Sequence, residues 1–187
     1  MSPNADVVII GGGITGASAA YQLARRGVRV ILCEKRFLGA GSSGKSSAIL
    51  RQHYSNEITA RMAHWSLTVF QNFSAVVGGD AGYTRTGFIM LVDARHRAGL
   101  EENVKLQQAV GVRTGIISLD ELRALDPGIV VTDEMAVAYE PDGGYADPAL
   151  TIAAFSAGAR QAGAEIWQET HVTNILQEGE RVTGVET

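Results

Sequence analysis

The N-terminal part of the chain is a regular succession of apolar runs and glycines. Four apolar residues, Val7–Ile10, lead directly into glycines at positions 11, 13 and 16, and a helix-forming run, Ala17–Arg26, follows at once. A second apolar run, Val28–Cys33, comes next. Short apolar runs that end at glycine turns are typical of buried strands. The pattern predicts a strand, a tight turn, a helix and a second strand parallel to the first.

Capping residues and apolar runs predict the remaining elements. Helices are expected at 56–75, 94–110, 119–126 and 148–162, capped by Ser55, Asp93, Ser118 and Asp147. Strands are expected at 87–92, 130–131, 135–139 and 165–167, followed by a hairpin of 172–176 and 181–185. The first of these helices carries an apolar stripe that we expect to face the core: Ile58, Met62, Trp65, Val69 and Phe73.

This order of elements predicts an α/β fold with two parts. Residues 1–77 and 140–187 are expected to form a Rossmann-like dinucleotide-binding domain, and residues 78–139 to form an inserted α+β domain. A length of 187 residues suits one domain or one and a half.

The glycine spacing has a direct chemical meaning. In the G-x-G-x-x-G pattern, Gly11 allows the tight turn, Gly13 lets phosphates approach the backbone, and Gly16 lets the helix pack closely on the strand. The amides from Gly12 through Ile14 and Thr15 to Gly16 lie at a helix N-terminus, which favours an anion. The turn is therefore predicted to hold a pyrophosphate, whereas a βαβ unit without a ligand is the alternative.

An acidic residue ends the second predicted strand. Glu34 follows Gly11 by 23 residues, close to where a carboxylate meets the ribose hydroxyls of a dinucleotide. Because a carboxylate repels a 2′-phosphate, NADP is not expected. Lys35, beside it, is a further candidate for cofactor binding.

A run of small and polar residues, Gly39–Ser47, follows. Its hydroxyl and amide groups are predicted to wrap a second part of the cofactor, with a plain surface loop as the alternative. The candidate residues are Ser42, Ser43, Lys45, Ser46 and Ser47. Gly39–Ser46 also has the literal spacing of a Walker motif, but it neither follows a strand directly nor opens a predicted helix, which excludes that interpretation.

Composition narrows the class of protein. The chain is 45% hydrophobic and 19% charged, with a net charge of −4 and without three consecutive basic residues, so nucleic acid is not an expected partner. No apolar segment approaches the roughly 20 residues of a membrane span, and no signal peptide is expected. The single cysteine, Cys33, fits a core position in a reducing compartment, which predicts a cytoplasmic location.

These motifs together resemble the D-amino-acid-oxidase-like group of FAD-dependent oxidoreductases, above all the flavin (beta) subunit of sarcosine oxidases and related dehydrogenases of N-methylated amino acids. Gly44–Tyr54 resembles the segment that passes the flavin, and Asp142–Pro148 resembles the turn before the helix that returns to the FAD domain. Gly163–Glu165 and the hairpin region containing Val172 match the part near the adenosine. The resemblance covers only the N-terminal part of that fold, which predicts a truncated chain or one piece of a split enzyme.

The resemblance implies roles for individual residues. FAD is expected, bound non-covalently, because neither the loop at Lys45 nor the turn at Asp147 contains the histidine that carries a covalent flavin in some relatives. Arg51 is expected to stabilise reduced, anionic flavin, and a surface salt bridge is the alternative. His53 is expected to face the substrate cavity, with packing as the alternative, and Arg85 is a candidate partner for a substrate carboxylate.

The predicted function is therefore oxidation of the C–N bond of a secondary or tertiary amine or amino acid, such as sarcosine, by hydride transfer to FAD. The expected partners are this small molecule and an additional subunit or missing C-terminal half. One alternative is an FAD-binding fragment that is inactive without a second polypeptide. A less favoured alternative is an NAD-dependent dehydrogenase, against which the long Ser/Gly loop argues.

Overall fold

The structure, a computed structural model, describes residues 4–187, which divide into two units. The first unit comprises the chain up to Ala48, Phe73–Gly82 and Ala146–Thr187, and the second comprises Ile49–Asn72 and Tyr83–Tyr145. These bounds differ from the predicted domains, since residues 49–72 and 140–145 join the second unit and residues 78–82 join the first. The strand and helix within residues 49–72 contact elements distant in sequence, which local patterns do not reveal. That the first unit binds FAD and the second the substrate stays a prediction.

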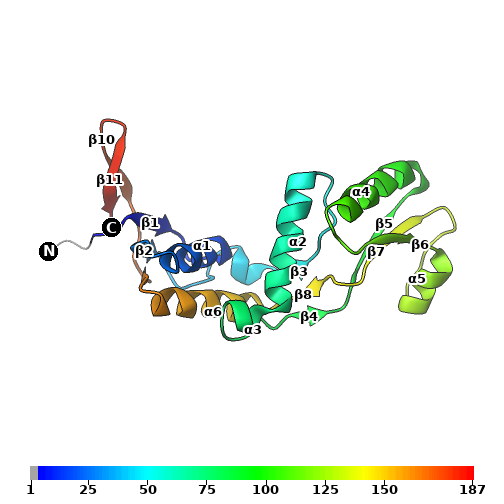
Figure 1. Ribbon diagram of the computed structural model, residues 1–187, viewed down its shortest axis with the longest axis horizontal. Coiled ribbons are helices and arrows are strands. Elements are labelled where there is room, and N and C mark those ends of the chain that lie inside the picture. The colour runs from blue at the N-terminus through cyan, green and yellow to red at the C-terminus, as the bar shows by residue number, and fades with distance from the viewer. Residues whose placement is uncertain (1–3) are drawn as a thin grey trace. The chain divides into compact units, whose positions relative to one another are not determined.

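The first unit is built on the predicted crossover. Strands β1 (Val7–Ile10), β2 (Val30–Cys33) and β9 (Glu165–Trp167) form a parallel sheet in the order β1-β2-β9. All four residues of β2, the central strand, are buried, as expected for a strand in a parallel sheet. Helix α1 (Ile14–Ala24) connects β1 to β2 (Figure 1), so the predicted βαβ unit is confirmed.

Two helices of the first unit pack closely against each other. Helix α6 (Pro148–Gln161) is capped by Asp147 as predicted, and it contacts α1. The rings of Tyr21 and Phe155 meet edge to face, with centroids 5.5 Å apart. A Cβ on Gly158 would lie 2.8 Å from the Tyr21 ring, so the close approach of the helices depends on this glycine. The short helix α3 (Phe73–Val76) adds the buried Phe73 ring to this cluster.

The predicted hairpin forms from β10 (Asn174–Glu178) and β11 (Arg181–Glu186), drawn in red in Figure 1. Between it and one face of the parallel sheet lies a cavity of about 590 Å³. Its lining includes Ile10 and Cys33 from the sheet and Val182 from the hairpin. Burial raises the pKa of the Cys33 thiol, as expected for the predicted core position.

The second unit contains two antiparallel sheets. One has the order β5-β7-β6, from β5 (Phe88–Val92), β6 (Gly115–Ile117) and β7 (Ala136–Glu140). The other has the order β3-β8-β4, from β3 (Ile49–Leu50), β4 (Thr84–Arg85) and β8 (Gly144–Tyr145). Strands β3, β4, β6 and β8, of two or three residues each, were not predicted.

Helices cover the larger of these sheets. Helix α4 (Arg97–Ala109) lies against this sheet (Figure 1). Its Leu100 and Val104 form a core with Ala136 and Ala138 of β7. The turn η2 (Ala94–His96) precedes α4. Helix α5 (Leu119–Leu125) begins with the predicted capping box, in which Ser118 and Glu121 bond to each other's backbone amides.

Several element predictions are wrong. Helix α2 (Glu57–Gln71) is capped by Asn56 rather than Ser55 and stops four residues short of the predicted end. Asp93 does not cap the following helix, because its side chain pairs with Arg95 and a 3₁₀ turn intervenes. The expected strand at 130–131 is absent from the described structure, where Val130 is 93% exposed.

The apolar stripe of α2 is the largest error. Ile58, Met62 and Trp65, predicted to face the core, are 74%, 64% and 62% exposed. The helix instead buries Ala60 and Leu67. Of the other two residues of the predicted stripe, Val69 is half-buried and Phe73 is buried as expected, in α3. A helical period alone does not show which face of a helix other elements cover.

Candidate functional site

The glycine turn of the first unit has the geometry that its sequence predicts. Gly11 has a φ of +107° and open space where a Cβ would stand. A Cβ on Gly16 would lie only 2.0 Å from the carbonyl oxygen of Gly11, so no larger residue fits there. Gly13 is the N-cap of α1 and has no side chain with which to cap the first helical turn. The amides of this turn therefore suit an anion supplied from outside the protein.

The carboxylate of Glu34 lies directly against this turn. One oxygen accepts a hydrogen bond from the Gly12 amide at 2.8 Å, and the other accepts from the Arg36 amide at 2.9 Å. The side chain is 9% exposed. The structure therefore brings Glu34 to the crossover as predicted, and contact with a ribose stays a prediction.

The serine loop also reaches the glycine turn. Ser43, in the 3₁₀ turn η1 (Ser43–Lys45), accepts a hydrogen bond from the Ile14 amide through its Oγ at 3.1 Å. Gly39 donates to the carbonyl of Gly12 at 2.9 Å. We expected every amide from Gly12 to Gly16 to face a diphosphate. Those of Gly12 and Ile14 instead bond side chains of Glu34 and Ser43, because these side chains provide the nearest acceptors.

The other predicted cofactor residues differ in their exposure to solvent. Ser42, Lys45, Ser46 and Ser47 are exposed, as are Thr15 and Lys35, whereas Val172 is half-buried. Lys35 lines a cavity of about 330 Å³ together with Arg36, Phe37, Gln168 and Glu169, immediately after Glu34. None of the hydrogen bonds described above involves Val172, so its predicted contact with the cofactor has no support from this geometry.

In the second unit, Arg51 and His53 line one cavity. Its volume is about 550 Å³, and Tyr54, Arg95 and His96 contribute to the same wall. The Arg51 guanidinium lies 5.0 Å from the centroid of the Tyr54 ring and donates a hydrogen bond to the His53 carbonyl at 2.9 Å. The cavity thus combines a fixed cation with aromatic surface, which suits a small anionic molecule.

A buried acid lies behind this wall and was not predicted. Glu140, the last residue of β7, is 1% exposed, and its Oε2 accepts from the Gln52 amide at 2.8 Å. Its Oε1 lies 3.8 Å from Nδ1 of His53, which is 7% exposed. Burial raises the pKa of Glu140, and burial followed by the charge of Arg51 lowers the pKa of His53. The only sequence signal was an acid between an apolar strand and a proline.

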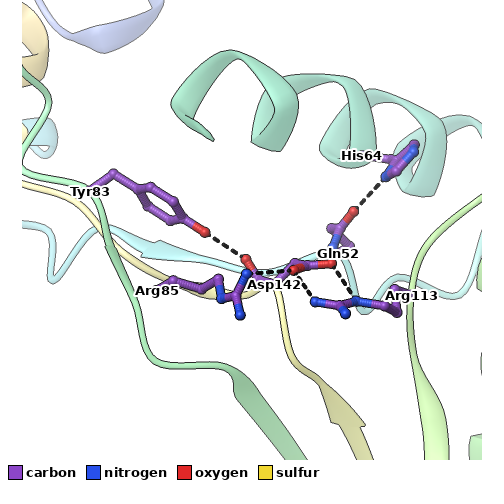
Figure 2. A network of polar contacts seen from close by, with 6 residues as sticks. All are labelled: Gln52, His64, Tyr83, Arg85, Arg113 and Asp142. Carbon is purple, nitrogen blue, oxygen red and sulfur yellow. Dashed lines mark hydrogen bonds and ion pairs between the residues drawn. The ribbon is translucent and has the colours of Figure 1, made fainter. Parts of the chain in front are cut away.

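Arg85 is already partnered. Its guanidinium lies 3.6 Å from the carboxylate of Asp142, which Arg113 also holds, through a 2.8 Å hydrogen bond and a second, shorter one. Tyr83 donates to the carbonyl of Asp142 at 2.8 Å. Figure 2 shows both guanidinium groups turned toward Asp142. Because this ion pair offsets its charge, Arg85 is a weaker candidate than Arg51 for binding a substrate carboxylate.

Comparison with known proteins identifies the family. Residues 6–187 match the family described as DAO, FAD dependent oxidoreductase. The chain belongs to this family. The predicted resemblance and the α/β fold class are thereby confirmed, and FAD is the cofactor of the family.

Individual relatives agree with this assignment. The chain is 30% identical over 193 residues to sarcosine oxidase subunit beta of Arthrobacter sp, covering 97% of this chain and 47% of that protein. It is 33% identical over 185 residues to the mitochondrial pyruvate dehydrogenase phosphatase regulatory subunit of Mus musculus, covering 98% and 21%. The L-proline dehydrogenase of P. horikoshii superposes with a TM-score of 0.91 at 30% identity, covering 99% and 49%. The chain thus spans about half the length of these three proteins or less.

The first unit fits FAD on observations of its own. Gly11 leaves open space above the turn, Gly13 offers no side-chain cap to α1, and Glu34 presents a carboxylate beside both. Within residues 4–187, no helix is both long and apolar enough to cross a membrane. The cytoplasmic location stays a prediction.

Proposed function

We propose that this chain forms the FAD-binding part, and a portion of the substrate-binding part, of an enzyme that oxidises the C–N bond of a secondary or tertiary amine or amino acid. The observation that carries this proposal is the convergence of Glu34 and the Ser43 loop on the glycine turn at the N-terminus of α1, in a member of this family. Bound FAD supplies the acceptor for a hydride from the carbon next to nitrogen.

The residues of this chain have distinct tasks in that reaction. The amides of the glycine turn hold the pyrophosphate, and Glu34 accepts hydrogen bonds from the ribose hydroxyls. Arg51 supplies positive charge that stabilises an anionic group, and the ring of Tyr54 under its guanidinium keeps that charge in place. FAD is held without a covalent bond, since the loop at 39–47 and the turn at 142–148 contain no histidine.

The chemistry of two relatives supports the substrate class. One is named for sarcosine and another for L-proline, and both compounds are amino acids with a secondary nitrogen. The Arg51 guanidinium in the wall of this cavity can receive the carboxylate of such a substrate.

Reconstitution tests the proposal. The purified protein is incubated with FAD, freed of excess and examined for flavin absorbance, and then mixed with sarcosine or L-proline without oxygen. Bound flavin that loses its absorbance on addition of either amino acid supports the proposal. A protein that takes up no FAD, or a bound flavin that no secondary or tertiary amine bleaches, would falsify it. The matched control is Glu34→Ala, which is expected to lower FAD uptake.

A second candidate is an FAD-binding subunit that is inactive alone. It is favoured by the length covered in the relatives, 47% of the sarcosine oxidase subunit beta. It is also favoured by the match to a protein named as a regulatory subunit. Flavin uptake without bleaching by amines, followed by bleaching once a second polypeptide is added, distinguishes this candidate. An NAD-dependent dehydrogenase is disfavoured by the family of the chain.

A further inference from the structure

Glu140 carries an ionisable carboxyl group at a position that is shielded from water. It is 1% exposed at the end of a strand whose other residues are mostly buried and apolar. Acidic side chains are almost never this deeply buried unless they are paired. One oxygen has its partner in the Gln52 amide. The other faces Nδ1 of His53, and in the part of the chain that the structure describes neither atom has a hydrogen-bond partner.

Of the two residues that Glu140 contacts, His53 lines the Arg51 cavity and Gln52 lies between Arg51 and His53 in the chain. Gln52 and His53 directly follow Arg51, whose guanidinium bonds the carbonyl of His53 at 2.9 Å. From the other side, Gln107 donates to the carbonyl of Tyr54 at 3.1 Å. Residues 51–54 are therefore held at successive peptide groups, and Glu140 provides the acidic group among these contacts.

One protonation state balances the charges of Arg51, His53 and Glu140. Arg51 is a permanent cation and acts on both Glu140 and His53. Burial and the Arg51 charge lower the pKa of His53, so its ring is neutral. A hydrogen bond with the Gln107 side chain raises that pKa, but this effect is the smallest of the three. An ionised Glu140 then balances Arg51. Because a carboxylate can only accept, the proton of the neutral ring belongs on Nδ1, facing Glu140.

We infer that Glu140 is a positioning residue of the active site: its carboxylate fixes the Gln52 amide and the Nδ1–H tautomer of His53, and so holds Arg51 in the cavity wall. This inference rests on the proposed function for its catalytic meaning, although the pairing of Glu140 with His53 does not depend on FAD. A shift of Arg51 by even about 1 Å would matter, since misplaced groups cost up to about a hundredfold in rate.

The first test is the tautomer of His53. Nitrogen–proton correlation spectra of the histidine rings, assigned with His53→Gln, are expected to show the neutral Nδ1–H form near pH 7. In Glu140→Gln the amide oxygen can still accept from Gln52 while its NH₂ group donates to Nδ1, so the ring is expected to change to the Nε2–H form. An Nε2–H tautomer in the unmodified protein overturns the inference, even if Glu140→Gln fails to fold.

The second test is kinetic. In the protein loaded with FAD, together with any second polypeptide that it needs, Glu140→Gln is expected to keep its FAD content. Its kcat/KM for the amine should fall about tenfold to a hundredfold. Glu134→Gln, the same change at an exposed position, is the matched control and should behave as the unmodified protein. Unchanged kcat/KM in a folded, flavin-loaded Glu140→Gln overturns the positioning role. Absence of FAD uptake by the unmodified protein counts against the proposed function instead, and the tautomer still decides the pairing.

Discussion

At the scale of single residues, Gly16 is a position with no room for a side chain. A methyl group there would lie 2.0 Å from the backbone oxygen of Gly11, and neither atom belongs to a flexible side chain. Gly16→Ala is therefore expected to lower the free energy of unfolding by about 1–3 kcal/mol and to reduce FAD uptake. Urea unfolding and flavin absorbance measure the two effects. Gly115→Ala, at a position with open space in the second unit, should change neither.

His53 gives the protein a dependence on pH. Burial lowers its pKa below the usual 6.5, so the unfolded chain takes up the proton more readily than the folded protein. The contribution of His53 to stability is complete above about pH 6.5 and is lost as the pH falls below it. Glu140, whose pKa is raised, acts in the opposite direction. Asp6 and Glu121, whose pKa values are lowered, lose their contribution only below the usual 3.8 and 4.5.

Unfolding temperatures measured between about pH 5 and pH 8 test this expectation. His53→Gln should reduce the loss of stability below about pH 6.5, whereas the exposed control His171→Gln should leave it as it is. An identical pH dependence in all three proteins would contradict the burial of a neutral ring at position 53.

At the scale of elements, helix α2 shows that an apolar residue in the sequence is not always buried in the structure. Ile58, Met62 and Trp65 are exposed, so replacing any of them by Ser should change the free energy of unfolding by less than about 0.5 kcal/mol. Leu67, on the same helix, is 5% exposed, and Leu67→Ala should cost about 2–5 kcal/mol. Urea unfolding of the four variants makes the comparison. A large loss in the Trp65 variant would mean that this face is covered.

Helix α6 depends on its cap. Asp147 accepts a hydrogen bond from the Leu150 amide at 2.9 Å, and Pro148 occupies the first helical position. Asp147→Ala should therefore cost about 1 kcal/mol in unfolding free energy, measured by thermal or urea unfolding. Asp147→Asn retains the acceptor and should cost much less. Equal losses in both variants would show that the charge, rather than the cap, is important.

At the scale of the whole molecule, the two units are expected to respond to different ligands. FAD should slow hydrogen exchange in the first unit, at the glycine turn, Glu34 and the Ser43 loop, because a ligand protects the backbone that it contacts. A secondary amino acid should slow exchange at residues 51–54 of the second unit. Mass spectrometry of peptides from the two units measures both effects. Protection by FAD confined to the second unit would contradict the assignment of the units.

Local chemistry alone was enough to predict the cofactor end of the site. The glycine spacing, the acid at the end of the second strand and the caps at Ser118 and Asp147 act over a few residues, so they can be recognised in the sequence. The family that this pattern indicated is the family to which the chain belongs. The sequence by itself thus determined the βαβ crossover and the geometry of its glycine turn.

Only the tertiary structure decided what depends on distant partners. Three features involve residues far apart in the chain: the exposed α2 stripe, the position of residues 49–72 in the second unit, and the Glu140–His53 pair. Burial and pairing are properties of the neighbours that folding brings together. A pattern of apolar and polar positions records that a side chain can be buried, whereas the packing of the other elements determines whether it is.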